Sequence, residues 1–380
     1  MRVNRRVVTG GLAASLASTL MPPRARAATY TGPNIVIIRF GGGVRRQETI
    51  NTATSYAPHL VHRLIPEGTL IPNMMIEQLQ GQNTSHSEGT LNILTGRYLA
   101  YRDAGSSLLA ERLEPTAPTL FEYFRKAYDI PAHEAILING EDRLQEEFFS
   151  FGAHRHFGIA YRSETLSLYR FKVASLRQRI ASGTGDTNAL QAQLAALSQQ
   201  DYRGLNAVQS PELDRFWQGW GEHYGLDGLK NPRGDRLLTE LGMRALDELN
   251  PKLMMINYQD PDYVHWGDLS HYTTAISVID AEIQRLMAHA ANHEAYRDNT
   301  IYVIVPDCGR DANPLVDLPL QHHFNTRSAH EIWALCVGPG VPKGRVMDRR
   351  VDQSQIAATL AERMGLSARE AEGSPLDIFA

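Results

Sequence analysis

Two apolar runs of the sequence, at residues 255–258 and 301–305, each end abruptly in side chains that can bind a metal ion. Runs of this kind are typical of buried strands, and open α/β sheets bind their ligands beyond the carboxyl ends of such strands. The polar residues that follow the runs are a carboxylate with an imidazole and a carboxylate with a thiol: Asp262, His265, Asp307 and Cys308. We therefore expect the ends of these two strands to share one metal site.

The rest of the chain alternates between expected strands and expected helices. Strands are predicted at residues 34–40, 70–79, 135–139, 252–258, 301–305 and 332–337, and helices at 118–128, 237–249, 272–290 and 353–364. Residues 34–40 form a near-continuous β-branched run, which is typical of a strand covered on both faces. The sequence therefore predicts an α/β fold with a largely parallel central sheet and helices on both of its faces.

The alternation fails between residues 141 and 235. This span contains a long helical stretch, residues 166–197, that is interrupted by glycines. We expect an inserted, mainly helical cap at 141–235, mounted on an α/β core formed by 28–140 and 236–380.

Residues 1–27 have the layout of a secretory signal. Arg5 and Arg6 precede a mildly apolar run at 7–21, and an Ala-Arg-Ala sequence ends at the expected cleavage site after Ala27. The paired arginines favour the twin-arginine route, so we expect a periplasmic or secreted protein. An uncleaved membrane anchor is the alternative, but the run is short and interrupted by glycine, serine and threonine. We expect no stable membrane span after cleavage.

The composition of the mature chain argues against several classes of protein. Removal of residues 1–27 takes away five arginines and no acids, so the formal net charge changes from −4 to −9. An acidic chain without a basic run is not expected to bind nucleic acid. The two cysteines, Cys308 and Cys336, are too few for a disulfide scaffold.

A hydroxyl-rich segment precedes an expected helix between residues 83 and 98. Thr84, Ser85 and Ser87 lie at its start, where backbone N–H groups and the helix dipole favour a bound anion. Capping of the helix by one of these hydroxyls is the alternative, and it requires no catalysis.

A second candidate anion contact follows the first expected strand. The glycine turn at 41–43 permits a close backbone approach, and Arg45 and Arg46 come directly after it. A plain turn is the alternative to a binding role.

The residues that can bind a metal form a set of carboxylates, imidazoles and one thiol. These groups suit zinc, with manganese or iron as alternatives where oxygen and nitrogen dominate. Each residue alone has a structural alternative, because Asp caps helices, His occurs on surfaces and Cys is often buried. The candidate ligands are Asp262, His265, Asp307, Cys308, His322 and His323.

The order of these motifs resembles the alkaline phosphatase superfamily, and in particular its sulfatase-like and phosphodiesterase-like members. The matching segments are Leu94-Thr95-Gly96-Arg97-Tyr98, the Asp262 to Gly267 segment, Asp307-Cys308-Gly309-Arg310 and His322-His323. The resemblance covers nearly the whole mature chain apart from the cap. It implies the fold of this superfamily, and one metal site formed by Asp262, His265 and either His322 or His323.

The chain departs from the family pattern at the second metal site that the resemblance implies. Gly41 stands where the family has an early ligand Asp, and Cys308 stands where it has a His. The family's usual spacing from Gly96 places His86 at the position of the nucleophilic hydroxyl, so Thr84, Ser85 or Ser87 would have to supply that group.

The resemblance implies an exported metal-dependent hydrolase of phosphate or sulfate esters, with one or two ions and a small-molecule ester as substrate. The alternative is a non-catalytic descendant that binds one metal and a ligand or partner, because Gly41 and Cys308 alter the second site. The sequence does not identify the substrate, since the cap and loops that would select it match no known pattern.

Overall fold

The computed structural model describes residues 28–76, 84–98, 101–103, 113–140, 157–198, 210–265, 267–313, 315, 320–324 and 326–379. Structural statements below refer to these residues. The expected signal at 1–27 and the first part of the expected cap, 141–156, lie outside them.

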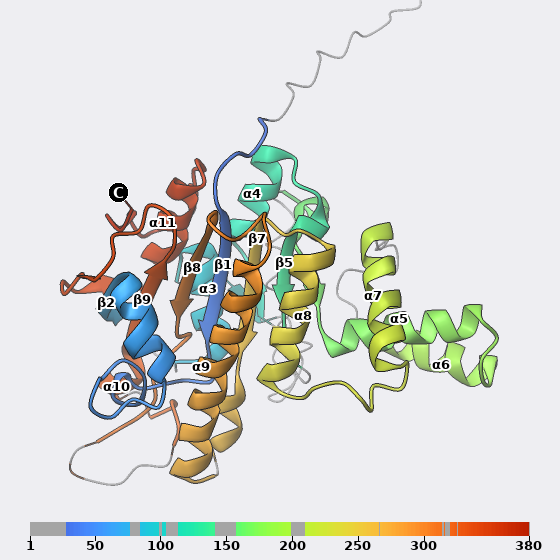
Figure 1. Ribbon diagram of the computed structural model, residues 1–380, viewed down its shortest axis with the longest axis horizontal. Helices are drawn as coiled ribbons and strands as arrows, with labels where there is room; N and C mark the ends of the chain where they lie inside the picture. The colour runs from blue at the N-terminus through green and yellow to red at the C-terminus, as the bar shows by residue number, and fades with distance from the viewer. Residues whose placement is uncertain are drawn as a thin grey trace, which may run out of the picture.

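Within the described residues, nine strands form one sheet (Figure 1). They are β1 (Asn34–Phe40), β2 (Gly68–Met75), β5 (Ala135–Ile138), β6 (Glu164–Leu166), β7 (Leu253–Tyr258), β8 (Thr300–Val305), β9 (Glu331–Val337), β10 (Arg345–Val346) and β11 (Val351–Asp352). Their order is β10-β2-β9-β8-β1-β7-β5-β6, and β11 also pairs with β2. The short strands β3 (Tyr101–Asp103) and β4 (Leu113–Pro115) pair separately.

The centre of the sheet is parallel. β1 lies between β7 and β8 and is parallel to both, and β5 is parallel to β7 and β6. β9 is antiparallel to β8 and β2, which makes the sheet mixed toward one edge. The predicted α/β fold with a largely parallel sheet is confirmed. The antiparallel direction of β9 was not predicted.

Helices cover both faces of the sheet (Figure 1). The longer ones are α3 (His86–Thr95), α4 (Leu120–Tyr128), α5 (Leu168–Ala181), α6 (Thr187–Ser198), α7 (Pro211–Tyr224), α8 (Asp235–Glu248), α9 (Leu269–Ala291) and α11 (Gln355–Arg363). Short helical segments are α1 (Arg46–Thr49), η1 (Leu60–Leu64), α2 (Ile65–Glu67), η2 (Ala132–Glu134), η4 (Ile159–Tyr161), η5 (Asp260–Val264) and α10 (Arg327–His330). No helix in the described part of the chain is long and apolar enough to cross a membrane.

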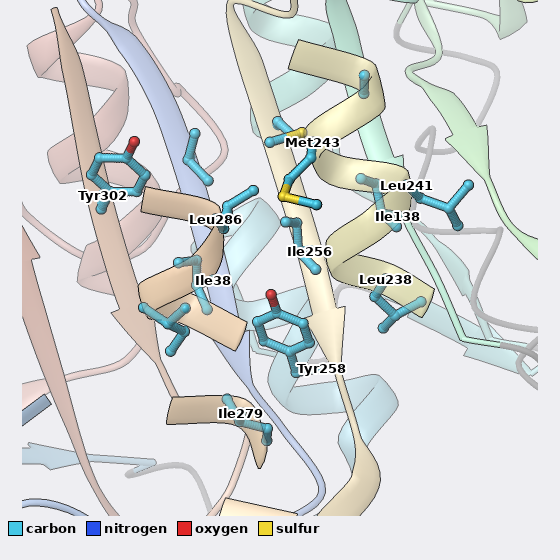
Figure 2. Packing of buried hydrophobic residues seen from close by; sticks show 14 of the residues in the cluster. Ile38, Ile138, Leu238, Leu241, Met243, Ile256, Tyr258, Ile279, Leu286 and Tyr302 are labelled. Atoms are coloured by element: carbon cyan, nitrogen blue, oxygen red, sulfur yellow. The ribbon is translucent and has the colours of Figure 1, made fainter. Parts of the chain in front are cut away.

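β1 shows why its sequence is apolar without interruption. Val36 and Ile38 pack in the core cluster that contains α8 and α9, whereas Ile35 and Ile37 pack in the cluster that contains α3, α4 and α11. Successive side chains of a strand point to opposite faces, so two covered faces require an unbroken apolar run. Burial of each such side chain contributes roughly 1.5–3 kcal/mol. Figure 2 shows the first cluster, with side chains of α8 and α9 against those of the central strands.

The range predicted as a cap contributes to two parts of the molecule. Strand β6 pairs in parallel with β5 and so extends the main sheet. Helices α5, α6 and α7 lie to one side of it, beyond α8 (Figure 1). The predicted break in the helical stretch is confirmed, because α5 ends at Ala181 and α6 begins at Thr187.

Candidate metal centre

The turn after β7 places Asp262 and His265 at the carboxyl end of the sheet. The buried carboxylate of Asp235 accepts hydrogen bonds from the backbone N–H groups of Gln259 and Asp260, both at 2.8 Å, and so fixes this turn. Helix η5 then carries Asp262, and His265 follows it. The His265 Nε2 atom lies 2.6 Å from Asp262 Oδ1. The pair predicted from the sequence is therefore formed.

A loop between β8 and β9 brings His322 to the same pair. Its ring is oriented by Thr84, whose carbonyl oxygen lies 2.5 Å from His322 Nδ1 and whose hydroxyl donates to the His322 carbonyl. The other ring nitrogen, Nε2, lies 3.2 Å from His265 Nε2 and 3.9 Å from Asp262 Oδ1. The protonated Nδ1 thus leaves the Nε2 lone pair directed at the pair on η5.

The first residue of α3, His86, lies between the ends of β7 and β8. Its Nε2 atom is 2.8 Å from Asp262 Oδ1, and its Nδ1 atom is 2.8 Å from Asp307 Oδ2. Ser85 caps the helix by accepting a hydrogen bond from the Glu88 N–H at 3.1 Å. A side chain at Gly89 would place its Cβ 2.0 Å from the Asp307 carbonyl oxygen, so glycine lets α3 approach β8 this closely.

Asp307 follows β8 and is fully buried. Its Oδ1 accepts hydrogen bonds from the N–H groups of Cys308 at 2.8 Å and Gly43 at 3.4 Å. Its Oδ2 faces His86, and Arg39 Nε lies 3.8 Å from the same oxygen. The buried Cys308 Sγ is 3.7 Å from His86 Nδ1.

Gly41 lies where the resemblance implies a ligand carboxylate. A Cβ built there would stand 2.2 Å from the carbonyl oxygen of Tyr258 and 3.2 Å from Asp307 Oδ2. The backbone at this point has no room for a side chain. The buried guanidinium of Arg39 occupies the neighbourhood instead, and it donates to Thr90 Oγ1 at 2.7 Å.

The protonation of the imidazoles follows from these contacts. Burial lowers the pKa of His86, but Asp307 and Cys308 outweigh burial and raise that pKa to about 9. Burial raises the pKa of Asp307, but His86 and Arg39 hold it well below its usual range. Burial, together with the neighbouring His86, holds the pKa of His322 far below its usual value. His322 is therefore neutral, as a metal ligand must be.

The described residues contain two groups whose donor atoms lie within 4.8 Å of one another. The first is His86, Asp262, His265 and His322, and the second is His86, Asp307 and Cys308. The first group, with three imidazoles and one carboxylate, fits a divalent transition metal. The second fits less well, because its carboxylate already contacts a guanidinium and two backbone N–H groups.

The structure brings together five of the predicted ligands and places His323 beside them. The exposed His323 ring packs 4.0 Å from that of His322, between ring centroids. Of the two alternatives left open by the sequence, His322 is the one whose nitrogen faces Asp262 and His265.

Two of the three predicted hydroxyls are engaged in other contacts. Thr84 bonds the His322 carbonyl, and Ser85 is the N-cap, which confirms the capping alternative for that residue. Ser87 follows His86 in α3, and its role as the attacking hydroxyl stays a prediction.

The predicted anion contacts are held by acidic residues. Arg45 donates twice to Glu48, at 2.9 and 2.7 Å, and Arg46 lies 3.7 Å from Glu331. Both arginines follow the glycine turn as expected, and their contact with a substrate stays a prediction.

His86 was not among the predicted site residues. The signal was present, because the family's spacing from Gly96 pointed to this position. The family has a hydroxyl at that position, so the spacing alone did not predict an imidazole ligand.

No protein-family model matches the sequence, and no curated protein matches it. Several solved structures are similar to this chain in fold. An alkaline phosphatase superfamily protein from Vibrio parahaemolyticus is 15% identical, with a TM-score of 0.53 over 92% of this chain and 71% of its own. A putative sulfatase from Bacteroides thetaiotaomicron is 12% identical, with a TM-score of 0.56 over 90% and 73%. A variant of the alkaline phosphatase PafA is 10% identical, with a TM-score of 0.57 over 93% and 100%.

At these low identities the likeness establishes the fold and no more. The resemblance inferred from the order of motifs is confirmed at that level. The chain has the α/β fold of the alkaline phosphatase superfamily, with His86, Asp262, His265 and His322 gathered at the carboxyl ends of its parallel strands.

Proposed function

We propose that this chain is an exported, metal-dependent hydrolase of phosphate or sulfate esters. One observation carries the proposal: four side chains that can bind a metal converge beyond the ends of β7 and β8, the edge at which open α/β sheets bind ligands. Structures with the same fold include an alkaline phosphatase and a putative sulfatase, which supports this class of reaction. The signal-like residues 1–27 support export.

The residues of the first group would hold the ion. Asp262 would supply the negative charge, while His265 and His322 would supply imidazole nitrogens, and the Thr84 carbonyl orients the His322 ring. A divalent ion bound there would polarise an ester oxygen and offset the charge that develops on it.

We assign the attack on the ester to water. The hydroxyls of Thr84 and Ser85 are held by backbone groups of the protein, and His86 occupies the position of the family's hydroxyl. The water oxygen forms a bond to phosphorus or sulfur while the ester P–O or S–O bond breaks. The leaving alkoxide takes up the proton that water loses, so an alcohol and the free oxyanion are the products.

The experiment is turnover by the mature chain after removal of metal and reconstitution with zinc or manganese. The substrates are nitrophenyl phosphate, bis-nitrophenyl phosphate and nitrophenyl sulfate, and His265→Ala is compared with His289→Ala. His289 makes a similar contact, 2.8 Å from Asp247, near the far end of α9, about 30 Å of helix from the site. Loss of turnover in His265→Ala alone is expected, whereas no turnover by any reconstituted form would contradict the proposal.

A second function is favoured by the surroundings of Gly41. With no room for a carboxylate there, and with Arg39 beside Asp307, the second metal site of the family is altered. A non-catalytic protein that binds one metal and a ligand or partner would fit this arrangement. It predicts bound metal without hydrolysis of any of the three esters.

A further inference from the structure

We propose that the chain holds a single metal ion, that His86 Nε2 is its fourth protein ligand, and that Asp307 orients His86 instead of binding a second ion. This assignment rests on the metal binding proposed above and specifies its form. The residues that would have formed a second metal site then support the first one.

The contacts of His86 set which nitrogen faces the ion. Its Nδ1 atom lies 2.8 Å from Asp307 Oδ2, so the Nδ1–H is donated to that carboxylate. The Nε2 atom then faces Asp262 Oδ1 at 2.8 Å, and an ion bound there replaces the Nε2 proton. Histidines that bind metals usually donate their other N–H to a carboxylate or carbonyl, which fixes the ring and strengthens the ligand.

His322 is held in the same way. The carbonyl oxygen of Thr84 lies 2.5 Å from its Nδ1 atom, and its Nε2 atom points inward. Two imidazoles from separate parts of the chain thus present Nε2 to one point beside Asp262. A single metal site is expected to have this arrangement, in which a protein oxygen holds Nδ1 of each imidazole and leaves Nε2 for the ion.

Asp307 has little capacity left for an ion of its own. One oxygen accepts from the N–H groups of Cys308 and Gly43, and the other faces His86. Arg39 already neutralises this carboxylate from 3.8 Å, and a dication placed beside that guanidinium would be repelled by it.

Gly41 removes the last donor of a second site. A Cβ there would stand 2.2 Å from the carbonyl oxygen of Tyr258, so a carboxylate cannot be accommodated without moving β7. Among the residues that the structure describes, a second ion would have only Asp307 and the buried Cys308 thiol, because His86 Nδ1 carries the hydrogen donated to Asp307.

The number of ligands bears on which ion supports turnover. Four protein donors would saturate tetrahedral zinc, as in structural zinc sites. Manganese takes more donors and keeps positions for the ester and water. Zinc is therefore expected to bind and support little turnover, and manganese to support more.

The test is the number and affinity of bound ions, measured without reference to activity. Wild type, Asp307→Asn and Cys308→Ala are loaded with manganese or zinc, counted by elemental analysis and titrated against a chelator. Asp247→Asn, which alters a surface His–Asp contact, and Cys336→Ala, which alters the other buried cysteine, are the controls. Circular dichroism checks the fold of each variant.

One ion per chain is expected in all forms, with affinity about 10–100-fold weaker in Asp307→Asn and unchanged in Cys308→Ala. Two ions in wild type, one of which is lost in either variant, would overturn the assignment. Unchanged affinity in a folded Asp307→Asn would also overturn it. One ion without hydrolysis would contradict only the proposed function, and hydrolysis with two ions would contradict only this inference.

Discussion

The two groups of candidate ligands, one beyond β7 and one beyond β8, share His86. They differ in the charges beside them and in the room left for a further ligand. On the side of β7, Asp262, His265 and His322 direct donor atoms at one point, and the Thr84 carbonyl orients the His322 ring from outside. On the side of β8, Asp307 is enclosed by backbone N–H groups and a guanidinium, and Gly41 leaves no room for a further ligand. The comparison shows that the ability of a group of side chains to bind a metal ion depends on the contacts those side chains already make, and not on residue type alone.

The largest effect is expected at the residue that both groups share. Replacement of His86 by Gln removes a ligand from the β7 side, so metal affinity should fall by more than the 10–100-fold expected for an orienting residue. Chelator competition measures it, with His289→Gln as the matched control. Unchanged metal affinity would show that His86 is not a ligand of the ion on the β7 side, and would contradict its assignment to both groups.

A smaller effect tests the group beyond β8. Gly41→Ala forces a Cβ toward the Tyr258 carbonyl, and overpacking of this kind costs about 1–3 kcal/mol. Urea unfolding measures the loss. Gly219→Ala is the control, because the nearest atom to its added Cβ is a Glu248 side-chain oxygen at 3.7 Å. Equal stability of the two variants would show that the β8 side has room for the family's carboxylate.

A third effect concerns pH. In the metal-free chain the raised pKa of His86 means that its charged form stabilises the fold. That contribution is complete below the unfolded pKa of about 6.5 and is lost as the pH rises through about 9. The difference in free energy of unfolding between wild type and His86→Gln should narrow over this range, as measured by urea unfolding with a chelator present. A constant difference would show that His86 is not held by Asp307.

The fold was predictable because its signals are local. Unbroken apolar strands and the 3.6-residue spacing of α8 and α9 depend only on neighbours in the sequence. The antiparallel direction of β9 depends on long-range pairing with β2 and β8, which no local pattern encodes.

The site was predictable in part. Asp262 and His265 lie three residues apart and follow a strand, so their pairing could be expected. The spacing from Gly96 indicated the position of His86 but not its contacts, because those depend on how closely Gly89 lets α3 approach β8. The surroundings of Arg39 and Gly41 are set by packing across the sheet.

The central claim is that one ion binds, on the β7 side. Anomalous diffraction at the metal absorption edge, from crystals of the chain loaded with zinc or manganese, tests it most directly. The account predicts one peak, with His86 Nε2, Asp262, His265 and His322 as its protein ligands. A second peak held by Asp307 and Cys308 would contradict it.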